Sequence, residues 1–150
     1  MNKKIALLKS ELKLMNDASS ILEYSYKKCL KIKLNDQFTF KELDAFENLS
    51  SRFARLSDIV IQKVLKTIHT INLDDITTVR DSINAAEKMN LIKSARLMIE
   101  MRELRNSIVH EYMPDAIKSI FISILRLTPH LQKDIKLINL YCEAKYPEEG

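Results

Sequence analysis

Residues 39–71 read TFKELDAFENLSSRFARLSDIVIQKVLKTIHTI. Thr39 and Glu42 have the Thr-x-x-Glu spacing of a capping box, which predicts a helix that begins at Phe40. Mostly apolar side chains then recur every three or four residues, the period of one helix face. They are Phe46, Leu49, Phe53, Leu56, Val60, Val64, Thr67 and Ile71. Such a long, narrow stripe predicts the seam of a helical bundle or of a dimer.

The same spacing continues on both sides of this segment. It predicts further helices over residues 3–30, from an acidic start at 73–75 to about 89, over 94–109, and from Pro114 onward. Asn90 is expected to end its helix in a left-handed conformation, and Pro129 either kinks the last helix or divides it. The buried stripe expected on the first helix is Ile5, Leu8, Leu12, Met15, Ser19, Leu22 and Tyr26.

The chain has 150 residues and one glycine, Gly150, at the last position. This length is typical of one domain, so residues 1–150 are expected to fold as a unit. Without an internal glycine the chain lacks the loops of Rossmann and P-loop nucleotide sites, and glycine-rich turns of an all-β fold are disfavoured. We expect an all-α, up-and-down bundle of about five helices.

Charge, cysteine content and the lack of a long apolar run limit the partners and the compartment that we expect. The formal net charge of +4 is compatible with a polyanionic partner. Cys29 and Cys142 lie far apart without metal-ligand spacing, so we expect buried free thiols. No apolar run is long enough to cross a bilayer, and the N-terminus has the pattern of an amphipathic helix rather than a signal peptide. The sequence predicts a cytoplasmic protein without membrane association, metal or cofactor.

Residues 100–112, EMRELRNSIVHEY, contain the pattern Arg-Asn-x-x-x-His-x-Tyr. An arginine is a permanently charged fork that clamps phosphate oxygens, and a histidine exchanges protons near neutral pH. Together they suffice for cleavage of a phosphodiester by a ribose 2′-hydroxyl without a metal. Arg105 and His110 are therefore candidate catalytic residues, and Asn106 is a candidate to hold the imidazole, the backbone or the substrate in place.

Helix geometry qualifies this site. Arg105 and His110 point about 140° apart on an ideal helix, so their side chains converge poorly unless the helix loosens or a second copy completes the site. Arg102 lies on the same stripe as Asn106 and His110, which makes it a candidate substrate-binding residue. The structural alternative is that His110 stabilises a helix end and that the arginines pair with nearby glutamates, namely Glu100, Glu103 or Glu111.

These residues resemble a known motif. Residues 105–112, RNSIVHEY, are similar to the Arg-x4-6-His motif of HEPN domains, in the Arg-x4-His-x-Tyr form of HepT-like toxins and of nucleotidyltransferase substrate-binding subunits. Asn106 matches the family's polar residue after the arginine, whereas Arg102 is not part of the motif. The resemblance covers about residues 80–120, and the rest of the chain matches in length and helix order.

The resemblance implies a homodimer in which the two motifs face a shared cleft. It implies a metal-independent endoribonuclease that acts on RNA, with Arg105 and His110 as catalytic residues. In HepT-like toxin–antitoxin pairs, a minimal nucleotidyltransferase is the antitoxin and transfers AMP from ATP to the motif tyrosine, here Tyr112. Some HEPN proteins are non-catalytic, so a substrate-binding partner subunit of a small nucleotidyltransferase is the alternative, and a structural helical dimer is a third.

Other charged and titratable side chains have less specific interpretations. For His69 and His130 we expect a surface position or a hydrogen-bonded position in the core. The lysines that close the first helix are either a solvated helix end or a patch that guides RNA. They are Lys27, Lys28, Lys31 and Lys33.

Overall fold

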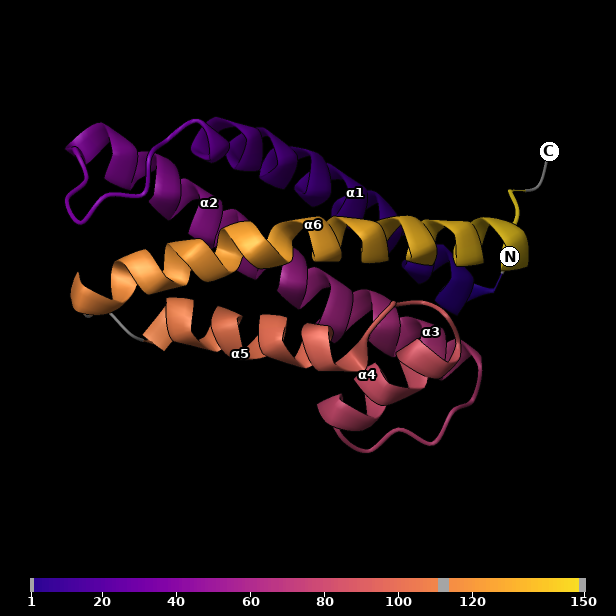
Figure 1. Ribbon diagram of the computed structural model, residues 1–150. Coiled ribbons are helices and arrows are strands. Elements are labelled where there is room, and N and C mark those ends of the chain that lie inside the picture. The colour runs from indigo at the N-terminus through magenta and orange to yellow at the C-terminus, as the bar shows by residue number, and fades with distance from the viewer. Residues whose placement is uncertain (1, 111–113, 149–150) are drawn as a thin grey trace.

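The computed structural model describes residues 2–110 and 114–148 (Figure 1). This part of the chain is all-α, with five helices packed as a bundle when the unbroken run 40–71 is counted once. The elements are α1 (Lys3–Leu30), the run of α2 (Phe40–Asp58), η1 (Ile59–Val64) and α3 (Leu65–Ile71), then α4 (Val79–Lys88), α5 (Ala95–His110) and α6 (Pro114–Lys145). Within the described ranges, no helix is long and apolar enough to cross a membrane.

The predicted capping box begins the unbroken helical run 40–71, the central helix of the bundle. The Thr39 side-chain hydroxyl accepts a hydrogen bond from the Glu42 backbone N–H at 3.1 Å, and the Glu42 carboxylate accepts one from the Thr39 N–H at 2.9 Å. Both bonds satisfy donors that the first helical turn leaves free. The start at Phe40 is therefore confirmed.

The central helix contains a π-helical segment that periodicity did not predict. From Ile59 to Val64 the backbone is wound more widely, and the Leu65 N–H donates to the carbonyl of Val60, five residues back. Such segments are rare and occur frequently at functional sites. This one directly follows Asp58, the last residue of α2.

The helix α4, which follows the central helix, begins later than the sequence predicted. Residues 73–75 form a loop, and α4 starts at Val79, where the Thr78 hydroxyl accepts the Asp81 N–H at 3.0 Å. Leu73 has a φ of 59°, which ends the preceding helix, and the Asp74 side chain contacts His69 instead of capping a helix. Asn90 has a φ of 60°, so its predicted left-handed conformation is confirmed.

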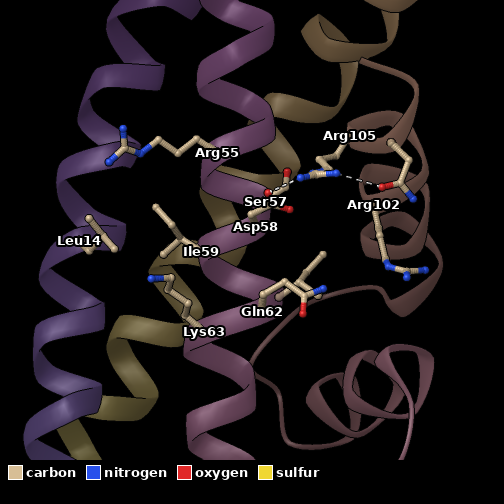
Figure 2. Close-up of a pocket in the computed structure, with 11 residues that line it drawn as sticks. Leu14, Arg55, Ser57, Asp58, Ile59, Gln62, Lys63, Arg102 and Arg105 are labelled. Atoms are coloured by element: carbon tan, nitrogen blue, oxygen red, sulfur yellow. Dashed lines mark hydrogen bonds and ion pairs between the residues drawn. The ribbon is translucent and has the colours of Figure 1, made fainter. Parts of the chain in front are cut away.

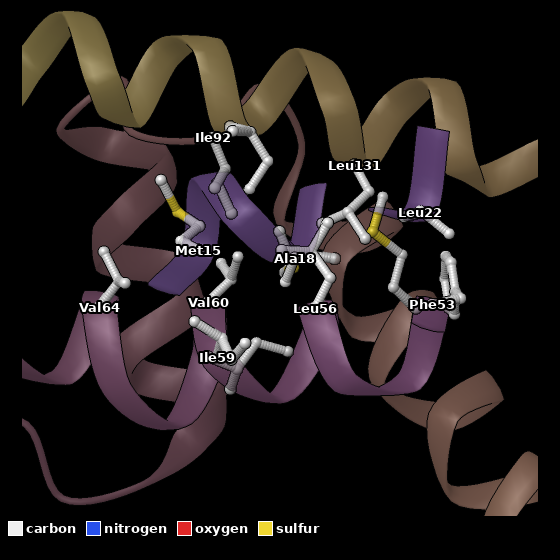
Figure 3. Packing of buried hydrophobic residues seen from close by; sticks show 14 of the residues in the cluster. Met15, Ala18, Leu22, Phe53, Leu56, Ile59, Val60, Val64, Ile92 and Leu131 are labelled. Carbon is white, nitrogen blue, oxygen red and sulfur yellow. The ribbon is translucent and has the colours of Figure 1, made fainter. Parts of the chain in front are cut away.

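The predicted apolar stripe of the central helix lies inside the chain's own core (Figure 3). Phe53, Leu56 and Val60 are fully buried and pack against α1 and α6, where Met15 and Leu131 lie. This stripe is therefore a seam of the bundle. The helix α6 completes the core without a break, because its Pro129 lies inside one continuous helix.

Three aromatic rings close the end of the bundle at which α5 ends and α6 begins. Phe46 is stacked on Phe121 with ring centroids 4.3 Å apart, and Phe38 meets both rings edge-on. Phe46 comes from α2 and Phe121 from α6, so the stack joins these helices near the last turn of α5.

Asp134 on α6 fixes the loop that leads into α5. Its side chain is 3% exposed, and its Oδ1 accepts a hydrogen bond from the Lys93 backbone N–H at 3.0 Å. Burial raises the pKa of Asp134 from 3.8 to about 6, and the Lys93 hydrogen bond opposes this rise only in part. The carboxyl therefore binds its proton more tightly in the folded chain than in the unfolded one.

This raised pKa predicts how stability changes with pH. Because the folded-state pKa lies above the unfolded value, the contribution of Asp134 is fully present below about pH 4 and is lost as the pH rises through about 6. The difference between the folded and unfolded pKa values corresponds to a change of about 3 kcal/mol in the free energy of unfolding. We expect Asp134→Asn, measured by urea unfolding at low and neutral pH, to remove a change of this order.

The matched control is Asp75→Asn, which removes a carboxylate that is exposed in a loop and keeps the one at Asp134, so the change that depends on Asp134 should remain. An Asp134→Asn variant with the same pH dependence as the wild type would show that this carboxyl does not titrate differently on folding.

Candidate functional site

A groove runs across the central helix between α1 and α5 (Figure 2). Its volume is about 630 Å³, and α2 and η1 form its floor. The lining residues include most of the sequence motif's first half together with side chains from distant segments. They are Leu14, Arg55, Ser57, Asp58, Ile59, Ile61, Gln62, Lys63, Arg102, Arg105 and Asn106.

Arg105 is held in this groove by a carboxylate. Its terminal Nη2 donates to Asp58 Oδ2 at 2.8 Å, and Nη1 donates to Asn106 Oδ1 at 3.4 Å. The Arg105 side chain is 28% exposed, so it is partly shielded from water. Its Nε is buried and has no hydrogen-bond partner among the described residues. A guanidinium has five N–H donors, so donors remain for a ligand after these contacts.

The other cations of the groove lack such a partner. No described residue forms an ion pair with Arg55, Lys63 or Arg102, and all three side chains are exposed. With Arg105, they set four positive charges against the single carboxylate of Asp58, a net charge of +3 among the lining residues. A concave surface with this excess attracts anions such as phosphate groups.

These contacts bear on the alternative that the arginines only pair with nearby glutamates. Glu100 pairs with Arg126 on α6, and Arg105 pairs with Asp58 on α2, so neither follows the predicted pairing of motif arginines with neighbouring glutamates. Arg102 has no ion pair within the described residues and belongs to the groove lining. Glu111 lies outside the described residues.

The structure brings Arg102, Arg105 and Asn106 together and leaves the second half of the motif open. His110 is the last residue of α5, but its side chain lies outside what the structure describes. Tyr112 lies in the undescribed segment 111–113. The predicted roles of these two residues therefore stay predictions.

His69 and the two cysteines occupy structural positions, and His130 is half-buried on α6. His69 is 2% exposed, with its two ring nitrogens 3.1 Å from Asp74 Oδ2 and 3.0 Å from the Ser82 carbonyl oxygen, so it is a hydrogen-bonded core residue. Both cysteines are buried free thiols, as predicted, and burial raises the pKa of Cys142 to about 11. In the parts of the chain that the structure describes, no group of three His, Cys, Asp or Glu side chains is placed to hold a metal ion.

Three groove residues were not found by sequence reasoning. Asp58, Arg55 and Lys63 lie about 40 to 50 positions before the motif, and no motif or spacing links the two segments. The central helix has a polar side opposite its buried stripe, and the same pattern is typical of any solvated helix. Only the packing of α2 and η1 beside α5 makes these charges part of one site.

Comparison with models of known protein families and with curated proteins finds no match to this chain. A five-helix, all-α bundle is compatible with a HEPN domain but does not identify one. The functional assignment therefore depends on the motif and on the chemistry of the groove.

Proposed function

We propose that the protein is a metal-independent endoribonuclease of the HEPN type, acting as the toxin of a toxin–antitoxin pair. The observation that carries this proposal is the position of Arg105 and Asn106, side by side in a groove whose lining has a net positive charge. A fixed arginine in a cationic groove can bind a phosphodiester and stabilise the negative charge that develops on its oxygens.

The proposed chemistry is attack by a ribose 2′-hydroxyl on the adjacent phosphorus. His110 removes the proton from the 2′-hydroxyl, and the 5′-oxygen of the next nucleotide leaves with a proton supplied by a second acid. Arg105 contacts the non-bridging oxygens of the phosphate, where charge accumulates in the transition state. The products are a 2′,3′-cyclic phosphate and a free 5′-hydroxyl.

A homodimer completes this site in the proposal. Positions 105 and 110 of an ideal helix face about 140° apart, whereas a two-fold axis beside the groove would bring the second copy's motif to the same cleft. The two histidines then serve as base and acid for one phosphate.

A non-catalytic partner subunit is the second candidate, and one contact favours it. The Asp58 carboxylate, 2.8 Å from Arg105, occupies one edge of the guanidinium that the enzyme needs for phosphate. If Asp58 neutralises Arg105 permanently, the chain binds a small nucleotidyltransferase and cleaves nothing.

Cleavage assays with the purified protein separate the two candidates. The endoribonuclease should cleave RNA without a partner protein, at a rate proportional to the protein concentration. Arg105→Ala should abolish cleavage while helicity by circular dichroism is unchanged. Stable complex formation with a nucleotidyltransferase, without RNA cleavage at any protein concentration, would instead support the partner subunit.

In this proposal, the antitoxin neutralises the toxin by transferring AMP to Tyr112. In the proposed reaction its hydroxyl attacks the α-phosphorus of ATP, AMP is transferred to the ring oxygen, and pyrophosphate leaves. We expect the intact mass of the wild-type protein to rise by one or more AMP units after incubation with ATP and the partner enzyme. Tyr112→Phe lacks the oxygen nucleophile and should show no increase.

Tyr24 supplies the matched control. It is 65% exposed on α1, so a Tyr24→Phe variant removes an accessible hydroxyl far along the chain from the motif and should still be modified. AMP transfer to Tyr112→Phe at the wild-type level would contradict Tyr112 as the acceptor.

A further inference from the structure

The cations of the groove lie on two margins, separated by the central helix. Figure 2 shows Arg55 and Lys63 extending toward α1, while Arg105 reaches the central helix from α5 on the other side. Arg102, also on α5, lines the groove on that side. Asp58 lies between the two margins, where its carboxylate pairs with Arg105. The motif, with Arg102 on the same helix, therefore accounts for the charge on the α5 margin only.

The α1 margin has the properties of a binding surface for a charged chain. Arg55 and Lys63 are exposed, and neither has an ion-pair partner in the described parts of the chain. They are eight residues apart on one helical run, and an α-helical rise would separate their Cα atoms by about 12 Å along its axis. The wider winding of η1 shortens this distance somewhat, and a few nucleotides of an extended strand can span it. On α1, in contrast, Lys13 is paired with Asp17.

The rest of the groove suits a single strand. Leu14, which is half-buried, gives the α1 side an apolar surface beside the cations, and this surface can contact ribose or a base. The carboxylate of Asp58 repels phosphate, so phosphates are favoured on the two cationic margins rather than in the middle. Gln62, on the floor, offers an uncharged amide for a base or sugar.

We propose that Arg55 and Lys63 form a second phosphate-binding subsite, which holds the RNA strand beside the phosphate that Arg105 contacts. The proposal rests on the proposed function for the identity of the ligand as RNA. In this arrangement the strand crosses the central helix from α5 to α1. Arg55 and Lys63 bind substrate, and they take no part in bond cleavage.

The test measures binding and cleavage separately. Binding of a fluorescent single-stranded RNA with 2′-O-methyl groups, which cannot be cleaved, is followed by anisotropy at several salt concentrations. The variant is the double substitution Arg55→Gln and Lys63→Gln. The control is Arg80→Gln with Lys136→Gln, which removes the same two charge types at exposed positions on α4 and α6.

We expect the groove variant to bind RNA about tenfold more weakly than the control at moderate salt, because it loses two phosphate contacts. The slope of log affinity against log salt should fall by about 1.4, since each phosphate of a single strand contributes about 0.7. On cleavable RNA the groove variant should raise KM and keep kcat, a split that a general loss of folded protein does not produce.

The outcomes distinguish this proposal from the proposed function. Equal affinity and salt slope in the groove and control variants, with cleavage intact, would overturn the subsite and leave the endoribonuclease standing. RNA binding that depends on Arg55 and Lys63, without cleavage by the wild type, would support the subsite and overturn the catalytic assignment. A wild-type protein that binds no RNA would overturn both.

Discussion

A folded His110→Ala variant should cleave RNA about a hundredfold to ten-thousandfold more slowly than the wild type, the range expected when a positioned general base is removed. His110 is the one motif residue with a proton-exchanging side chain near neutral pH. The loss should appear in kcat, because the histidine acts on the bond-breaking step rather than on RNA binding.

His130→Ala is the matched control for this prediction. His130 is half-buried on α6, outside the groove lining, so its removal should leave kcat near the wild-type value. Circular dichroism and sizing of all variants verify that helicity and association are unchanged. Wild-type cleavage by a folded His110→Ala protein would remove the histidine from the mechanism.

The largest effect on stability is expected from Phe46→Ala. Phe46 is fully buried and stacked on Phe121 at 4.3 Å, so its truncation leaves a cavity between α2 and α6. Substitutions of this kind cost about 3–5 kcal/mol of unfolding free energy. Because the stack lies at the end where α5 ends, the variant should also lose cleavage activity at temperatures where it remains mostly folded. Urea unfolding followed by circular dichroism measures the first effect.

Phe40→Ala provides the comparison for Phe46→Ala. Phe40 begins the same helix but is 87% exposed, so its truncation should change stability by less than about 0.5 kcal/mol. Similar losses for the two variants would mean that the aromatic stack does not hold this end of the bundle.

Local rules predicted much of the helix arrangement. The capping box of Thr39 and Glu42 fixed one boundary because the signal lies within four residues, and Asn90 ended its helix for an equally local reason. The start at residues 73–75 was wrong because Asp74 binds His69, a contact that the helix start pattern does not contain. Local patterns predict a feature well when no distant side chain competes for the same groups.

The buried face of α1 shows the same limit. Leu8, Met15 and Leu22 are buried as predicted, but Glu11 and Ser25 are buried beside them. Glu11 accepts a hydrogen bond from the Thr67 hydroxyl at 2.5 Å, and Ser25 accepts one from an arginine of α2. Apolar periodicity cannot predict buried polar residues whose partners lie on another helix.

The candidate site also contains residues that local sequence predicts and residues that only packing reveals. Arg105 and Asn106 follow from one short motif, and Arg102 follows from its helical spacing to Asn106. The structure places all three in one groove. The Asp58 partner of Arg105 lies 47 residues away, so only the packing of α2 beside α5 reveals it. The same packing adds the second cationic margin, which the motif alone does not contain.

The most direct measurement is the end group of RNA cut by the purified wild-type protein in the presence of EDTA. A nuclease that uses Arg105, His110 and the ribose 2′-hydroxyl predicts cleavage under these conditions, products with 2′,3′-cyclic phosphate ends, and no cleavage of DNA of the same sequence. Mass spectrometry of the fragments identifies the ends. Cleavage of RNA and DNA alike, products with 5′-phosphate ends, or no cleavage by the folded protein would contradict the account.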